Sequence, residues 1–253
     1  WKGINELSAI MLHSDGRNQW FDKPLHLIIT PDGEAAINME HSSTDGSAIV
    51  SLSGFIYNDD GSDSDFLWTE KGQGPRELPF VLDDRLRATF HRAGEEFDAL
   101  RGDVASRVVL FTDFGKDRIK KCKVSPDSFI QMAIQLAQYR LFGHCRSTYE
   151  AIMTRRFLKG RTEAMRSVSR ESCAFVSSMD DPGEEAAEKA RKLRTAIERQ
   201  SARLKECKNG QGVERHMLGL LGMYRRHGRE LGIAEEPAIF SDKGFTTLTT
   251  SLL

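Results

Sequence analysis

The sequence predicts a mixed α/β protein, in the α+β sense, from two observations. Residues 24–30 and 34–41 are rich in strand-forming residues and are separated by a Pro-Asp-Gly turn, in which proline presets φ and glycine accepts a positive φ. Residues 82–101 carry apolar side chains mostly at helical spacing, and an apolar run at 107–114 follows that we interpret as a strand. A hairpin combined with a helix-then-strand order indicates mixed sheets flanked by helices.

The clearest helix begins at Ser125, which is an N-cap residue followed by proline, and it ends at Gly143. Residues 180–206 are highly charged with one apolar stripe, which predicts a solvated surface helix. Residues 213–231 predict another amphipathic helix, and 244–253 a closing strand.

A domain boundary is expected in the acidic stretch 56–79, which is rich in glycine, serine and aspartate and has no periodicity. We therefore divide the chain into residues 1–80 and 81–253. The chain opens at Trp1 and stops just after a threonine-rich run, so we expect it to be a piece of a longer protein.

Composition narrows the classes of function. The 253 residues include 36 Lys and Arg against 37 Asp and Glu, a formal net charge of -1, and 39% are hydrophobic. A chain of this size buries enough surface for one large core or two smaller ones. The charge balance disfavours a nucleic-acid partner, which normally selects a clear excess of basic residues. No run approaches the roughly 20 apolar residues of a transmembrane segment, and no targeting signal is visible.

Cysteine spacing predicts neither a metal site nor a disulfide framework. The four cysteines are widely separated, and they form no CxxC pair or zinc-type Cys/His spacing. We expect reduced thiols and no bound metal at Cys122, Cys145, Cys173 and Cys207.

The sharpest local motif is Glu-His-Ser-Ser-Thr-Asp-Gly at residues 40–46. His41 follows a predicted strand, Asp45 comes four positions later, and glycine then lets the backbone turn. A histidine in tight local structure can act as a general base near neutral pH, because its unperturbed pKa is about 6.5. A structural histidine at a strand end is the alternative interpretation.

Several segments in a fixed order resemble the carnitine/choline acyltransferase family, and they span most of residues 17–251. The segments are NQWFDKPLHLIITPDG, MEHSSTDG, FGKDRIKKCKVSPDSFIQMAIQLAQYR, STYEAIMTRRFLKGRTEAMRS, GVERHMLGL and TLTTS. The resemblance implies a two-domain fold like that of chloramphenicol acetyltransferase, here incomplete at its N-terminal side. It also implies a reversible enzyme that uses acyl-CoA and carnitine as substrates and has no tightly bound cofactor.

The resemblance implies three catalytic residues. His41 is the base, which takes a proton from the carnitine hydroxyl or the CoA thiol, with direct attack on the thioester and no acyl-enzyme. Asp45 organises the loop, and Ser251 is the hydroxyl donor to the oxyanion. Thr249 stands where the family more commonly has serine.

Carnitine carries a carboxylate that choline lacks, and a fixed guanidinium with hydroxyl donors suits it. By resemblance, Arg215 binds this carboxylate and Tyr149 and Thr162 donate hydroxyls, so we expect carnitine rather than choline as the acceptor. For Arg215, a salt bridge on the helix surface with Glu214 or Glu235 is the alternative.

Coenzyme A contacts are also implied by the resemblance. Lys116 and Lys120 lie on the 3'-phosphate, and Asp127 and Glu150 lie near the adenine or pantetheine. Spacing alone shows five cations within 116–123, just before a helix N-terminus, which favours an anion but also fits a solvated basic loop.

The rival functions are choline acetyltransferase and a truncated, non-catalytic fragment that binds CoA or a partner. The family includes mitochondrial and peroxisomal members, so the resemblance implies one of these compartments. Residues 58–65 look like an insertion relative to the family.

Overall fold

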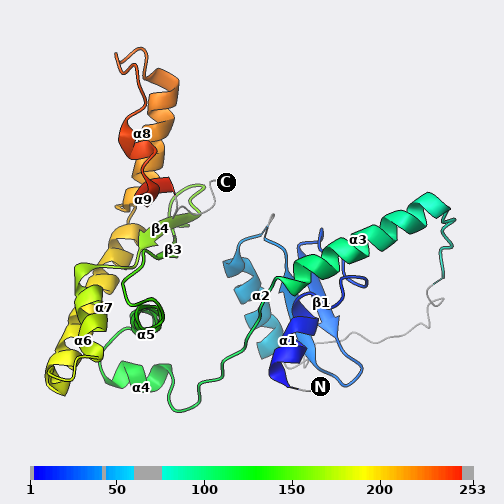
Figure 1. Cartoon of the computed structure of the whole chain (residues 1–253), viewed down its shortest axis with the longest axis horizontal. Helices are drawn as coiled ribbons and strands as arrows, with labels where there is room; N and C mark the ends of the chain where they lie inside the picture. Colours follow the sequence, from blue (N-terminus) through cyan, green and yellow to red (C-terminus); the bar gives the residue numbers. More distant parts are fainter. Residues whose placement is uncertain (1–2, 42–43, 60–75, 247–253) are drawn as a thin grey trace. The chain divides into compact units, whose positions relative to one another are not determined.

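The computed structural model describes residues 3–41, 44–59 and 76–246. The chain divides into two compact units, residues 1–110 and 111–253, each of which is considered by itself (Figure 1). Both units combine helices with a two-stranded antiparallel sheet, so the mixed helix and strand content agrees with the predicted class. None of the helices within the described residues is long and apolar enough to cross a bilayer.

The first unit is built around the predicted hairpin. Its elements are α1 (Ile4–Leu12), β1 (Leu25–Ile29), β2 (Ala35–Met39), α2 (Gly46–Asn58) and α3 (Asp84–Gly102). β1 and β2 pair antiparallel from Leu25 opposite Met39 to Ile29 opposite Ala35, which confirms the hairpin. The Asn38 amide donates to the carbonyl of Leu12 at 2.6 Å, and this contact ties α1 to β2.

Helix α3, predicted at 82–101, packs with the first unit. Phe97 stacks on Phe21 with 5.6 Å between ring centroids, and Arg17 pairs with Asp98 at 3.1 Å. The predicted division at residue 80 therefore falls within this compact unit, while the chain passes into the second unit after residue 110.

The predicted strand at 107–114 is wrong, because residues 104–115 form neither helix nor strand. A strand needs a neighbour to pair its backbone. The Val108 amide instead donates to the Asn5 side chain at 2.6 Å, and Val109 is 86% exposed. The apolar side chains of this run are therefore largely exposed within the described part of the chain.

The second unit contains two buried clusters, one formed by three of its helices and one formed by a hairpin and a helix. Its elements are α4 (Lys116–Lys121), α5 (Pro126–Phe142), β3 (Tyr149–Met153), β4 (Thr162–Arg166), α6 (Arg170–Met179), α7 (Ala186–Lys208), α8 (Val213–His227), a 3-10 turn (Ala238–Phe240) and α9 (Lys243–Thr246). The helix beginning at Ser125 is confirmed as α5, because the Ser125 hydroxyl accepts from the Ser128 amide at 3.3 Å. Gly143 ends it in the left-handed region at φ 73°, which favours glycine.

Helix α7 confirms the predicted charged surface helix at 180–206, but it begins later. It starts at Ala186, since residues 180–185 turn and Asp180 pairs with Arg140 at 2.6 Å. Ala196 and Ile197 lie in the main core and Leu193 packs against it, while the charged residues of this fully described helix are all exposed or half-buried. The apolar stripe thus packs against α5, α6 and the second hairpin, and the charged side chains remain on the solvent side.

The C-terminal prediction of a strand at 244–253 is wrong for its described part. Residues 244–246 belong to α9, where the Thr246 amide donates to the Asp242 carbonyl at 3.0 Å and the Gly244 amide to the Asp242 side chain at 2.7 Å. Residues 247–253 lie outside the described residues. Helix α8, predicted at 213–231, ends earlier, at His227.

Truncation of Met132 should destabilise the protein strongly. Met132 is 1% exposed and lies in the cluster with Phe175, Val176, Ala196 and Ile197. Met132→Ala removes this packing and should lower the free energy of unfolding by about 2–5 kcal/mol, measured by urea denaturation. Met223→Ala is the control, because Met223 is 53% exposed and its truncation should change stability by less than about 0.5 kcal/mol. Equal effects at the two positions would contradict this assignment of the core.

Candidate functional site

His41 is exposed and lies two residues beyond the end of β2. Its Nδ1 is 3.0 Å from the carbonyl oxygen of Thr44. A carbonyl only accepts, so Nδ1 must carry the proton, and in the neutral ring the lone pair is on Nε2. This hydrogen bond therefore selects the tautomer that a general base needs.

Asp45 occupies the N-cap position of α2, with extended backbone at φ -82° and ψ 147°. Its carbonyl accepts from the Ala48 amide at 2.9 Å and so starts the helix. The backbone of Asp45 thereby joins the segment that contains His41 to the start of α2.

The β3–β4 hairpin carries two of the residues predicted to bind carnitine, Tyr149 and Thr162. Tyr149 pairs with Arg166, and Met153 pairs with Thr162. Directly opposed residues share a face, so Tyr149 and Thr162 lie on the same face. They are at opposite ends of the hairpin, roughly 13 Å apart along the strands.

Arg215 and Thr162 are brought together although they are far apart in sequence. The Arg215 Nε donates to the Thr162 carbonyl at 2.6 Å, and Nη2 lies 3.5 Å from the Thr162 hydroxyl. Arg215 also forms an ion pair with Glu214 at 3.4 Å, so the alternative partner named from the sequence is present. The guanidinium side chain is 28% exposed, which leaves it accessible beside a hydroxyl.

Glu163, a residue that sequence reasoning does not single out, supports this pair from the neighbouring strand position. It is 3% exposed, and its carboxylate accepts from the backbone amides of Glu214 at 2.9 Å and Arg215 at 3.2 Å. The sequence carries no signal for this role, because the burial of Glu163 and its partner 51 residues away are properties of the fold.

The basic residues predicted to bind phosphate lie on α4. Lys116 and Lys120 are both exposed and are one helical turn apart, so they share a face of this helix. Two further members of the cluster, Arg118 and Lys121, lie on the same short helix.

Asp127 and Glu150 interact in the structure, which brings these two predicted CoA contacts into one neighbourhood. Burial raises the pKa of Glu150, and the charge of Asp127 raises it further, while a hydrogen bond from Gln200 and the charge of Lys208 oppose the rise. The Gln200 amide donates to the Glu150 carboxylate at 2.9 Å. Gln200 is 2% exposed and is not singled out by the sequence.

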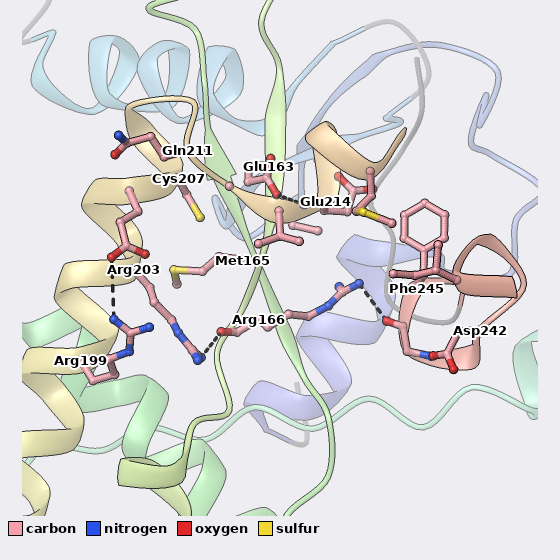
Figure 2. Close-up of a pocket in the computed structure, with 17 residues that line it drawn as sticks. Glu163, Met165, Arg166, Arg199, Arg203, Cys207, Gln211, Glu214, Asp242 and Phe245 are labelled. Carbon is pink, nitrogen blue, oxygen red and sulfur yellow. Dashed lines mark hydrogen bonds and ion pairs between the residues drawn. The ribbon is translucent and has the colours of Figure 1, made fainter. Parts of the chain in front are cut away.

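A cavity of about 470 Å³ is lined in part by Glu163, and Figure 2 shows it between the C-terminal part of α7, β4 and residues 239–245. Arg166 crosses it to donate to the Gly244 carbonyl at 3.2 Å. Burial raises the pKa of the Cys207 thiol to about 11, so this thiol stays protonated at neutral pH and is a poor nucleophile.

The predicted site residues are divided between the two units and the C-terminal residues outside the described part of the chain. Thr162 and Arg215 are in contact, and Asp127 and Glu150 are electrostatically linked, all within the second unit. His41 and Asp45 belong to the first unit. Ser251 and Thr249 lie outside the described residues, a few positions after Thr246.

Comparison with known proteins gives consistent matches along the chain. The family model for choline/carnitine O-acyltransferases matches residues 4–253. A carnitine O-acetyltransferase from Columba livia is 35% identical over 85% of this chain and 35% of its own length. A peroxisomal carnitine O-octanoyltransferase from Homo sapiens is 33% identical over 96% of this chain and 39% of its own length.

A mitochondrial carnitine O-acetyltransferase from Saccharomyces cerevisiae is 33% identical over 99% of this chain and 38% of its own length. The chain thus spans less than two fifths of each of these three relatives. With a family model that matches nearly every residue, and relatives above 30% identity along most of the chain, the chain belongs to the choline/carnitine O-acyltransferase family.

Proposed function

We propose that the protein transfers acyl groups reversibly between coenzyme A and the hydroxyl of carnitine, with His41 as general base. The observation that carries this proposal is the hydrogen bond from His41 Nδ1 to the Thr44 carbonyl at 3.0 Å. It leaves the Nε2 lone pair to accept a proton, and an exposed ring is accessible to substrate.

In the proposed reaction, His41 Nε2 takes the proton from the carnitine hydroxyl while the oxygen attacks the thioester carbonyl. Ser251 donates a hydrogen bond to the oxyanion, and Asp45 fixes the loop that carries the histidine. The C–S bond then breaks, and the CoA sulfur receives the proton from the imidazolium. The same steps in reverse return the acyl group to CoA.

Carnitine rather than choline is the proposed acceptor. The contact between Arg215 and Thr162 supports this choice, because it places a guanidinium beside a hydroxyl where a carboxylate can accept from both. Tyr149 is the third proposed contact, on the same face of the hairpin. Relatives named carnitine acyltransferases support the same acceptor.

For coenzyme A, we propose Lys116 and Lys120 as the phosphate contacts and Asp127 and Glu150 as contacts to the remainder of the molecule. The two lysines on one face of α4 favour an anion. The rest of the proposal follows the family: no tightly bound cofactor, a chloramphenicol-acetyltransferase-like fold divided at residue 80, and a mitochondrial or peroxisomal compartment. The names of the yeast and human relatives support the compartments.

Thiol release from acetyl-, octanoyl- and palmitoyl-CoA, with carnitine or choline as acceptor, tests the proposed function directly. Release that depends on carnitine supports it and also reports the preferred acyl chain. Release only with choline would contradict the acceptor assignment. Absence of release with both acceptors would favour a fragment that binds without turnover, and CoA binding by calorimetry would then be measured.

Substitution of the proposed base should remove turnover but not CoA binding. His41→Ala deletes the proton acceptor, and general-base catalysis is typically worth about 10²–10⁴-fold in rate, so kcat should fall by that factor. The CoA dissociation constant, measured by calorimetry, should stay within about twofold. His91→Ala, an exposed histidine on α3, is the control. Unchanged kcat in His41→Ala would end the assignment of the base.

Loss of the guanidinium should affect one substrate selectively. Arg215→Ala should raise the KM for carnitine roughly 10- to 150-fold, because a charge-assisted hydrogen bond contributes about 1.5–3 kcal/mol. The KM for acyl-CoA should change little. Arg225→Ala, an exposed arginine in the last turn of the same helix, is the control. Parallel increases in both KM values would instead indicate a structural role for Arg215.

The ionisation of Glu150 should weaken the fold as pH rises. Because its pKa is raised in the folded state, the folded protein binds this proton more tightly than the unfolded chain, so stability falls from about the ordinary glutamate pKa of 4.5 upward. Glu150→Gln removes this loss. The variant should therefore be more stable than wild type at pH 7 and equal to it below pH 4.5, measured by urea denaturation at both pH values. Glu198→Gln, exposed on α7, should follow wild type at both.

A further inference from the structure

The N-terminus of α8 is capped by a residue from another element. Its N-cap is Gly212, which has no side chain to accept from the first backbone amides. Those amides are normally satisfied by a serine, threonine or aspartate at the N-cap. Here the Glu163 carboxylate does so from β4, at 2.9 Å from the Glu214 amide and 3.2 Å from the Arg215 amide.

Gly212 is required for space and not for its backbone conformation. Its φ of -70° and ψ of 153° are open to any residue. A Cβ built there would lie 2.2 Å from Cδ and 2.4 Å from Cγ of Glu163. Real Cβ contacts are essentially never this short, and Glu163 is buried, so either residue would have to move. The glycine therefore allows the glutamate to reach the helix end.

The first turn of α8 is thereby held against β4 by contacts to two consecutive residues, Thr162 and Glu163. The backbone of Arg215 is bound to the Glu163 carboxylate, and its side chain is bound to the Thr162 carbonyl at 2.6 Å. Figure 2 shows Glu163 beside Glu214, joined by the hydrogen bond to the Glu214 amide. A shift or rotation of α8 would break both contacts together.

We propose that Glu163, with the space left by Gly212, is a positioning residue for recognition of the carnitine carboxylate. This inference rests on the proposed function. It adds that the guanidinium of Arg215 is aimed by a buried acid that itself does not touch the substrate. The acid acts through backbone amides, so its loss should weaken carnitine recognition while leaving the guanidinium in the chain.

A purely structural cap would stabilise the helix without directing the arginine. The two roles differ in which substrate they affect. Displacement of Arg215 affects the ligand that has a carboxylate, since a misplacement of about 1 Å can cost up to about 10²-fold. General loosening of the second unit would also affect acyl-CoA, because the proposed CoA contacts Asp127 and Glu150 lie in the same unit.

The first test is amide hydrogen exchange of the whole chain at residues 214 and 215, with and without carnitine. Carnitine should slow exchange there in the wild type. Glu163→Gln keeps the side-chain shape but loses one acceptor oxygen and the charge, and it should remove at least half of this protection. Glu163→Ala should remove all of it. Glu235→Gln, exposed in the segment after α8, is the control and should behave as wild type.

The outcomes separate the inference from the proposed function. Protection by carnitine that persists unchanged in the Glu163 variants overturns the inference and leaves carnitine binding intact. No effect of carnitine on the wild type overturns the proposed acceptor and the inference with it. In both cases the ligand-free exchange rates report whether the variants still fold.

The second test uses the close approach of Gly212 to the Glu163 side chain. Gly212→Ala should raise the carnitine KM roughly tenfold or more in the wild type, but by less than about threefold in the Glu163→Ala background, where the clash is gone. The KM for acyl-CoA should stay within about threefold throughout. Additive effects of the two substitutions, or equal rises in both KM values, would overturn the proposal.

Discussion

The buried face of α7 is the constraint on which the second unit depends. Ala196 and Ile197 complete the core formed with α5 and α6, and further along the helix Gln200 bonds Glu150. Arg203 then donates to the backbone carbonyl of Arg166, at the end of β4. The helix that fills the core therefore also fixes the hairpin that carries the proposed substrate contacts. Stability and site geometry are consequently linked through one helix, and a shift of its register would move several site residues at once.

Elements whose signals are local can be predicted from the sequence. The helix after Ser125 is predicted correctly because its cap, its proline and its terminal glycine lie within the same stretch, and the first hairpin because its turn residues do. Residues 107–114 are not, since a strand exists only where a neighbour pairs with it. The apolar stripe of α7 is predicted correctly, but its packing partners in α5 and α6 are not, because they lie elsewhere in the sequence.

The candidate site likewise contains residues that the sequence identifies and residues that only the structure identifies. His41 stands out by its motif, and Arg215 by family resemblance, and the structure then supplies the tautomer of one and the hydroxyl partner of the other. Glu163 and Gln200 cannot be found this way, because each acts on a residue about fifty positions distant. A buried polar side chain is informative only once its partner is known, which requires the fold.

The position of Arg215 has an electrostatic consequence. It lies in the first turn of α8, at the positive end of the helix macrodipole, where a cation is normally disfavoured. Two buried acidic residues, Glu163 and Glu214, lie at this helix end, where negative charge is favoured. The guanidinium is held at this helix end by its ion pair with Glu214 and its hydrogen bond to the Thr162 carbonyl. The two acids together offset a position that the helix itself disfavours for a cation, and removal of either would reduce that compensation.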